Sequence, residues 1–321
     1  MKAALCKTLD GPEALSLETV PEPVAKPGQA IVTIKAVGLN FADTLITRGK
    51  YQYKPDLPFA PGAEIAGVLD GPAGELKAGQ RVLAYVGWGG AAERIAVDAE
   101  ALIPVPDGVS DVMAAGLSVT YGTAMHGLRE RGRLKAGETV VVTGAAGGAG
   151  QAAVEVAHLL GARVIAVASS EEKLALTRRL GADDGILYPG SDLKEAVRRL
   201  TGGKGADVVY DCIGGDASEP LIRALAWKGR FLVVGFAAGE IPRIPLNLLL
   251  VKGAEATGVF WGEAIRRDPQ GHRSDMAQLL NWVAEGRLKP ITHGTFPLAE
   301  ISRALAVLDA RAARGKVVLT L

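Results

Sequence analysis

The sequence predicts an α/β protein in which a doubly wound parallel-sheet domain is inserted into a β-rich domain. The first hundred residues are rich in strand-like runs, and strand-like and helical segments alternate regularly from Thr139 onward. A glycine-rich turn follows the first strand of that alternation. A chain of 321 residues is also too long for one hydrophobic core, which favours two domains.

Short apolar runs separated by Gly and Pro indicate the β-rich domain. We expect its strands at Lys2–Cys6, Gln29–Val37, Ala63–Leu69, Gln80–Ala84 and Glu93–Val97. A helix over Leu298–Asp309 and a strand over Lys316–Leu321 would return the chain to this domain. The pattern suits a small barrel or sandwich-like domain formed by residues 1–118 plus 260–321.

Residues 119–259 have the rhythm of a parallel sheet covered by helices on both faces. We expect near-continuous apolar strands at Thr139–Thr143, Arg163–Ala168, Ala206–Cys212 and Arg230–Phe236. The helices expected between and after them are Gln151–Leu160, Glu171–Leu180, Asp192–Leu200 and Ala217–Trp227.

Charge and cysteine usage exclude several classes of protein. The chain has 36 basic and 35 acidic residues, interspersed, so no basic field favours nucleic acid or a membrane surface as partner. Cys6 and Cys212, each in a predicted strand, are too few for a disulfide framework or a four-thiolate zinc site. There is no signal-peptide pattern and no apolar run of about 18 residues, so we expect a cytoplasmic protein.

The turn after Thr139–Thr143 matches a dinucleotide fingerprint. Ala145, Gly147 and Gly150 occupy its three glycine positions, with Gly148 and Ala149 inside the same turn. Backbone N–H groups of such a turn approach a pyrophosphate, and the following helix N-terminus adds positive potential. The strand before and the helix after give the context of a Rossmann site, although a purely structural turn is the alternative.

The end of the second strand favours NADPH over NADH. NAD sites carry an acidic residue there for the ribose hydroxyls, whereas this chain has Ala168. Ser169 and Ser170 offer hydrogen bonds to a 2′-phosphate and Lys173 offers charge. If the serines only cap the next helix, the cofactor choice stays open.

These segments, with Asn40–Asp43 (NFAD), Pro61–Gly67 (PGAEIAG) and Gly315–Leu319 (GKVVL), resemble the medium-chain dehydrogenase/reductase superfamily. The chain is similar, along essentially its whole length, to the zinc-free NADPH:quinone oxidoreductase (ζ-crystallin-like) branch. The most specific stretches are Gly144–Gly150, Val119–Leu128 and Pro245–Trp261. The resemblance implies a GroES-like catalytic domain together with a Rossmann domain.

The zinc ligands of related alcohol dehydrogenases are missing. The first ligand position resembles Asn40, and the His of the Gly-His-Glu motif is Ala63 here. No cysteine lies between Cys6 and Cys212, so we expect no metal site. Without a Lewis acid the acceptor should already be electron-poor, as a quinone or an α,β-unsaturated carbonyl is.

The resemblance also implies catalytic residues. Asn40 and Asp43 would lie beside the nicotinamide, unless they only cap a loop, and Thr123 would contact the nicotinamide or its ribose. Tyr51 would orient a carbonyl or relay a proton, or else form an aromatic wall with Tyr53. One departure is Leu45, where this branch often has a tyrosine.

Cofactor contacts follow from the same resemblance. Lys173, Tyr188 and Arg311 match positions around the 2′-phosphate, and Arg311 would otherwise be a solvated arginine. Four residues would supply backbone groups to the nicotinamide carboxamide: Gly235, Phe236, Phe260 and Trp261.

The sequence thus predicts a zinc-free oxidoreductase that passes hydride from NADPH to a quinone or enone, and we expect a homodimer. A reductase of 2-enoyl thioesters would share every cofactor residue and is the first alternative. A non-catalytic NADPH-binding protein, structural or redox-sensing, is the second.

Overall fold

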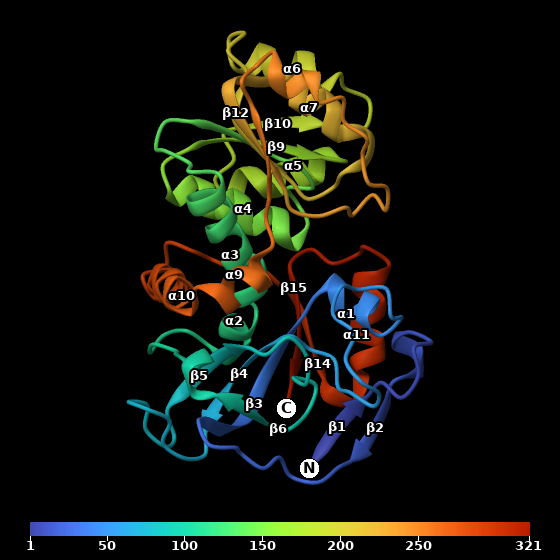
Figure 1. Cartoon of the computed structure of the whole chain (residues 1–321), viewed down its shortest axis with the longest axis vertical. Coiled ribbons are helices and arrows are strands. Elements are labelled where there is room, and N and C mark those ends of the chain that lie inside the picture. The colour runs from blue at the N-terminus through green and yellow to red at the C-terminus, as the bar shows by residue number, and fades with distance from the viewer. The chain divides into compact units, whose positions relative to one another are not determined.

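The computed structural model describes all residues, 1–321, and divides them into two compact units. One unit comprises Met1–Val119 with Ala264–Leu321, and the other comprises Thr120–Glu263 (Figure 1). The boundaries expected from the sequence are 1–118 with 260–321, and 119–259. None of the helices is both long and apolar enough to cross a membrane.

The unit Thr120–Glu263 is built on a six-stranded sheet in which every pair is parallel. Its strand order is β10-β9-β8-β11-β12-β13, which in chain order reads 3-2-1-4-5-6, the doubly wound arrangement of dinucleotide-binding domains. The predicted doubly wound sheet is therefore confirmed. The strands are β8 (Thr139–Val142), β9 (Arg163–Ala168), β10 (Asp184–Leu187), β11 (Ala206–Asp211), β12 (Leu225–Val233) and β13 (Glu255–Gly258).

Both faces of this sheet are buried, as near-continuous apolar strands require. Val141, Ile165 and Val209 share one core with apolar residues of α6 and α7, which also pack on each other (Figure 1). The alternate strand residues are also buried, and α4 packs on β8 and β9. The helices are α3 (Ser118–Met125), α4 (Gly148–Leu159), α5 (Glu171–Arg179), α6 (Leu193–Leu200), α7 (Ser218–Arg223), α8 (Asn247–Leu250) and α9 (Trp261–Arg267), with a π-helix at His126–Arg131.

The structure corrects the sequence analysis in four details. The predicted helix Ala217–Trp227 ends at Arg223, and β12 begins at Leu225 rather than at Arg230. The early start of the strand could not be predicted, because a bulge with Lys228 at φ 60° interrupts the alternation of its side chains. The edge strands β10 and β13 were not predicted, because they are short and partly exposed. Cys6 and Cys212 each lie one residue beyond a strand.

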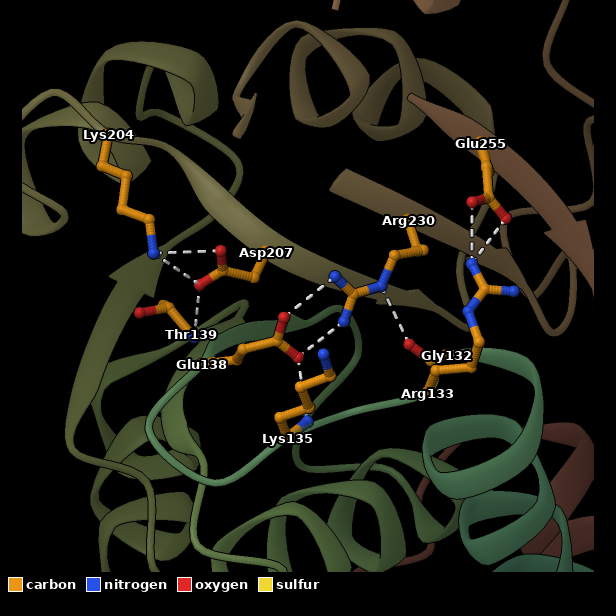
Figure 2. A network of polar contacts seen from close by, with 9 residues as sticks. All are labelled: Gly132, Arg133, Lys135, Glu138, Thr139, Lys204, Asp207, Arg230 and Glu255. Atoms are coloured by element: carbon orange, nitrogen blue, oxygen red, sulfur yellow. Dashed lines mark hydrogen bonds and ion pairs between the residues drawn. The ribbon is translucent and has the colours of Figure 1, made fainter. Parts of the chain in front are cut away.

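Charged side chains form hydrogen bonds and ion pairs at the amino-terminal ends of the parallel strands (Figure 2). Arg230 of β12 forms two hydrogen bonds with Glu138, at 2.6 and 3.0 Å, and donates a third to the Gly132 carbonyl at 2.9 Å. Asp207 of β11 accepts the Thr139 N–H at 2.9 Å, which ties β11 to β8. Arg133 pairs with Glu255 at the start of β13 (Figure 2). Ion pairs therefore stabilise the amino-terminal ends of these strands.

The other unit is β-rich, as predicted. Its larger sheet has the order β14-β15-β3-β4-β5-β7, with β6 also paired to β3, and β1 pairs with β2. The five strands expected in the first hundred residues all form, with ends shifted by one or two residues. The strands are β1 (Lys2–Leu5), β2 (Ser16–Thr19), β3 (Gln29–Leu39), β4 (Glu64–Leu69), β5 (Arg81–Tyr85), β6 (Arg94–Asp98), β7 (Ile103–Pro104), β14 (Thr292–Pro297) and β15 (Lys316–Thr320).

The two distant parts of this unit share one sheet and one core. β15 lies between β14 and β3, antiparallel to β3, so the end of the chain pairs with residues 36–39. Val317 and Leu319 of β15 pack in the same core as Val32 and Ile65. The predicted helix Leu298–Asp309 is a 3₁₀ turn, Leu298–Glu300, followed by α11. The helices are α1 (Phe41–Ile46), α2 (Asp111–Ala115), α10 (Pro269–Ala284) and α11 (Ile301–Asp309).

Candidate functional site

The glycine turn after β8 brings backbone very close to backbone. Gly147 is the N-cap of α4, and its N–H donates to the Gly144 carbonyl at 2.9 Å. A Cβ on Gly150 would lie 2.2 Å from that same carbonyl oxygen, so only glycine fits there. The Ala145 N–H donates to the Val167 carbonyl of β9 at 3.1 Å. The turn therefore holds the start of α4 against two strands, which suits a phosphate-binding loop.

Ser169, Ser170 and Lys173 lie together at the carboxyl end of β9. The Ser170 hydroxyl caps α5 by accepting the Lys173 N–H at 3.2 Å. The Lys173 ammonium donates to the Ser169 hydroxyl at 2.8 Å. No carboxylate occupies the end of the strand, where Ala168 is buried. Ser170 thus acts as a helix cap, while Ser169 and Lys173 form an exposed, positively charged pair.

Glu171 and Glu172, which follow these serines, are exposed on the first turn of α5. Acidic residues at this position favour the helix N-terminus. Tyr188 follows β10 and is half-buried, and its N–H donates to the Ala168 carbonyl at 2.8 Å. Its backbone therefore lies next to the end of β9. Arg311 is exposed, belongs to the other unit and follows α11.

Thr123, Phe260 and Trp261 lie within the same unit, although more than 130 residues separate the first from the others in the sequence. Trp261 is buried, and a Cβ on Gly122 would lie 2.7 Å from its ring. The tryptophan ring therefore packs directly on the helical turn that carries Thr123, which is itself half-buried. Phe260, next in the chain to Trp261, is half-exposed.

Gly235 and Phe236 follow β12, and hydrogen bonds from this segment join it to the segment after β11. The Ala237 and Ala238 N–H groups donate to the Cys212 and Ile213 carbonyls at 3.2 and 2.9 Å. Phe236 is 40% exposed, so its ring is available to a ligand. Both segments lie at the carboxyl end of the parallel sheet, where doubly wound proteins bind their ligands.

Asn40 in the β-rich unit belongs to a buried charged network. Its amide nitrogen donates to Glu64 Oε1 at 2.9 Å, and its amide oxygen accepts from Lys316 Nζ at 2.6 Å. Lys316 also forms an ion pair with Glu64, and Glu64 accepts the Val119 N–H at 2.8 Å. Glu64 is fully buried and Lys316 is 8% exposed. The network fixes the orientation of the Asn40 amide.

The Asp43 carboxylate accepts hydrogen bonds from backbone N–H groups. Its two carboxylate oxygens accept the N–H groups of Asn40, at 2.7 Å, and Gly62, at 3.0 Å. Burial raises the pKa of Asp43 to about 6, against the opposing effect of those two hydrogen bonds and of Lys316. Asp43 therefore ties the start of α1 to the Gly62 turn and titrates near neutral pH.

Tyr51 and Tyr85 are influenced by the charge of Asp43, and Tyr53 lies beside Tyr51. The rings of Tyr51 and Tyr53 are 5.8 Å apart at 57°, and both pack on a small core of Cys6, Ile46 and Phe59. Burial raises the pKa of Tyr51, with smaller contributions from Tyr53 and Asp43. Burial also raises the pKa of Tyr85, again with contributions from those neighbours. The Tyr51 and Tyr85 phenols therefore keep their protons at neutral pH and can donate hydrogen bonds.

The sequence analysis did not assign a role to Glu64 or Lys316. Each is a lone charged residue at the start of an otherwise apolar strand, in EIAGVL and KVVLT. A charged residue in a buried strand requires a partner of opposite charge. A lone charge in an apolar strand was therefore the sequence feature that could have indicated this ion pair. No group of three or more His, Cys, Asp and Glu side chains in the structure is arranged to hold a metal ion.

Comparisons with family models match two parts of the chain. Residues 26–107 match the alcohol dehydrogenase GroES-like domain, and residues 148–285 match the family described as zinc-binding dehydrogenase.

Individual relatives cover the whole chain. It is 39% identical over 324 aligned residues to quinone oxidoreductase-like protein 2 of Rattus norvegicus, spanning 100% of this chain and 92% of that protein. The quinone oxidoreductase of Thermus thermophilus, solved also in complex with NADPH, superposes with a TM-score of 0.87 at 37% identity, covering 100% of both chains. A mycocerosic acid synthase-like polyketide synthase of Mycobacterium tuberculosis is 32% identical over 91% of this chain and 14% of its own length.

Replacing Lys316 with Met should reduce the free energy of unfolding by about 3–5 kcal/mol, because Glu64 would remain buried without its cation. Chemical denaturation measures this loss. Adding Glu64→Gln to Lys316→Met should recover much of it, since the amide needs no counter-charge.

The matched control is Lys7→Met, which removes an exposed lysine from its pair with Glu18 and should have little effect. If Lys316→Met were no more harmful than Lys7→Met, the buried ion pair would not stabilise this unit.

Proposed function

Because the chain belongs to the quinone oxidoreductase family of the medium-chain dehydrogenase/reductase superfamily, we propose that it is an NADPH-dependent oxidoreductase that reduces a quinone or an α,β-unsaturated carbonyl. The observation that carries this function is the Ser169–Lys173 pair at the end of β9, where no carboxylate stands. A carboxylate there would repel a 2′-phosphate, whereas an ammonium group attracts it.

The residues present fit NADPH. The Gly150 backbone approaches Gly144 more closely than any side chain would allow. The first N–H groups of α4 have no acceptor within a helix and would meet the pyrophosphate. Lys173 and Ser169 would hold the 2′-phosphate, and Tyr188 and Arg311 would border it. Gly235, Phe236, Phe260 and Trp261 would hold the carboxamide end. When bound, NADPH supplies the hydride.

The protein's own groups bind and orient the acceptor. We assign Asn40 to the acceptor side by resemblance to the family, and Glu64 and Lys316 hold its amide in one orientation. Thr123 would contact the nicotinamide or its ribose. Tyr51 keeps its proton at neutral pH, so its hydroxyl can donate a hydrogen bond to a carbonyl oxygen and increase the electron deficiency of the conjugated carbon. Asp43 would support this arrangement by holding the Asn40 and Gly62 backbone.

The tyrosines favour a planar acceptor. The half-buried rings of Tyr51 and Tyr53 offer an aromatic surface, and planar conjugated rings pack well on such surfaces. Leu45, half-buried on α1, adds an apolar contact. Similarity to a segment of a polyketide synthase supports the second candidate, a reductase of 2-enoyl thioesters. A non-catalytic NADPH-binding protein is the third.

A panel of acceptors separates these candidates. With NADPH, we expect quinones and alkenones to be reduced with higher kcat/KM than enoyl thioesters. A thioester preferred by several orders of magnitude would establish the second candidate. If NADPH raised the Tm but no acceptor accelerated its oxidation, the protein would be a non-catalytic binder.

Lys173→Ala should weaken NADPH binding by roughly 1.5–3 kcal/mol, the scale of a lost charged hydrogen bond, and leave NADH nearly unaffected. Titration calorimetry with both cofactors measures the difference. Arg178→Ala, which removes another exposed cation from the same helix, is the control and should change neither affinity. Equal losses for the two cofactors would show that Lys173 does not bind the 2′-phosphate.

We further propose that the protein is a cytoplasmic homodimer. Both cysteines are free, which suits a reducing compartment. β13 ends the parallel sheet with one unpaired side, and a strand edge of this kind can pair with its copy. Apolar side chains are exposed nearby: Trp227 of β12 at 70%, and Leu250 and Val251 of α8 and its C-cap at 79% and 67%.

Leu250→Glu should shift the oligomer toward monomer by placing a charge in the apolar contact, and sedimentation velocity measures the shift. Val24→Glu, at an apolar residue 84% exposed in the other unit, is the matched control and should leave the oligomer unchanged. A wild-type protein that is monomeric at micromolar concentration would contradict the dimer.

A further inference from the structure

Asp211, the last residue of β11, is buried in a dense set of hydrogen bonds. It is 3% exposed. Its Oδ1 accepts the Thr143 hydroxyl at 2.6 Å and the N–H groups of Ile213 and Gly214 at 3.0 and 3.2 Å. Its Oδ2 accepts the Ser218 hydroxyl at 2.6 Å. Every donor is neutral, so the carboxylate serves here as a multiple acceptor and has no cation as partner.

The first of these contacts reaches the glycine turn. Thr143 is the residue between β8 and Gly144, and it is 1% exposed. Its hydroxyl donates to Asp211 and accepts the Cys212 N–H at 2.9 Å, so one side chain joins the ends of two neighbouring strands. A Cβ on Gly144 would lie 2.7 Å from the Ile213 side chain, which shows how closely the two segments pack. Asp211 thereby fixes the point from which the glycine turn begins.

The remaining contacts reach the segment after β12. Asp211 fixes the segment Cys212–Gly214, and that segment's carbonyls accept the Ala237 and Ala238 N–H groups. The Asp211 carbonyl itself accepts the N–H groups of Val234 and Gly235, at 3.0 and 3.3 Å. One residue thus supports both the glycine turn and the Gly235–Phe236 segment.

We propose that Asp211 is a positioning residue for the whole dinucleotide, holding the pyrophosphate turn and the carboxamide-binding segment in register. The inference rests on the proposed function, because it takes those two segments as the NADPH site. Its effect is independent of the 2′-phosphate, so it applies equally to NADPH and NADH.

The same strand provides an internal control at its other end. Asp207 of β11 also ties β11 to β8, by accepting the Thr139 N–H, but it does so at the amino-terminal edge of the sheet and beside Lys204 (Figure 2). A substitution at Asp207 disturbs the same pair of strands far from the glycine turn. It therefore reports what general destabilisation alone does to cofactor affinity.

The test measures the Kd of NADPH and NADH by titration calorimetry for Thr143→Val, Thr143→Ser, Ser218→Ala and Asp207→Ala. Thr143→Val keeps the shape but removes the hydroxyl, and should raise both Kd values by the same factor of about ten, the scale of one hydrogen bond to a charged group. Thr143→Ser should restore both, because it keeps the hydroxyl. Ser218→Ala should raise both by a smaller, equal factor, and Asp207→Ala should lower the Tm without changing either Kd.

Unchanged Kd values in both Thr143→Val and Ser218→Ala would overturn the proposal, as would an equal loss of affinity in Asp207→Ala. Should Thr143→Val fail to fold, Ser218→Ala compared with Asp207→Ala decides the outcome. Failure of the proposed NADPH site looks different, because the wild-type protein would then bind neither cofactor. Lys173→Ala separates the effects further, since it alone should discriminate between the two cofactors.

Discussion

The buried ion pair between Glu64 and Lys316 is the interaction on which the β-rich unit depends. A carboxylate removed from water is tolerated only with a cation and further hydrogen-bond donors, and Glu64 receives both from Lys316, Asn40 and Val119. The pair links β4 to β15 across β3, which lies between them. It also determines which way the Asn40 amide faces, since its oxygen accepts from a cation and its nitrogen donates to an anion. The orientation of the Asn40 amide therefore depends on both Glu64 and Lys316.

Much of the fold could be predicted because it depends on local patterns. The apolar strands and intervening helices identify the doubly wound sheet, and the glycine turn identifies its ligand-binding edge. The features that were missed lack such a signal. β10 and β13 lie at sheet edges, where burial and therefore apolar pattern are weakest, and a bulge divides β12. Glu64 and Lys316 are 252 residues apart in the sequence, so no local spacing pattern could predict their ion pair.

The candidate site shows the same limit. Residue types indicated Ser169, Ser170 and Lys173, and the structure brings them together because they are close in sequence. The contacts around Asp211 and Asn40 depend on which strands become neighbours, so they emerge only from the folded chain.

The amino-terminal and carboxyl-terminal ends of the parallel strands are stabilised by different interactions. At the amino-terminal edge, Arg230 with Glu138 and Arg133 with Glu255 join charges of opposite sign, which salt screens where they are exposed (Figure 2). At the carboxyl edge, Asp211 accepts only from hydroxyl and backbone N–H groups. The second arrangement does not depend on an ion pair, so it is less sensitive to ionic strength. The carboxyl ends of β8 and β11 are thus joined through neutral donors.

The position of β15 has a consequence for biosynthesis. The strand lies inside its sheet, between β14 and β3, and carries the lysine that neutralises Glu64. A nascent chain therefore cannot complete the β-rich unit until β15 has been made, whereas Thr120–Glu263 is contiguous and can fold earlier. The unit Thr120–Glu263 can therefore be complete while the sheet of the other unit still lacks β15. A chain that lacked β15 would leave Glu64 buried without its cation.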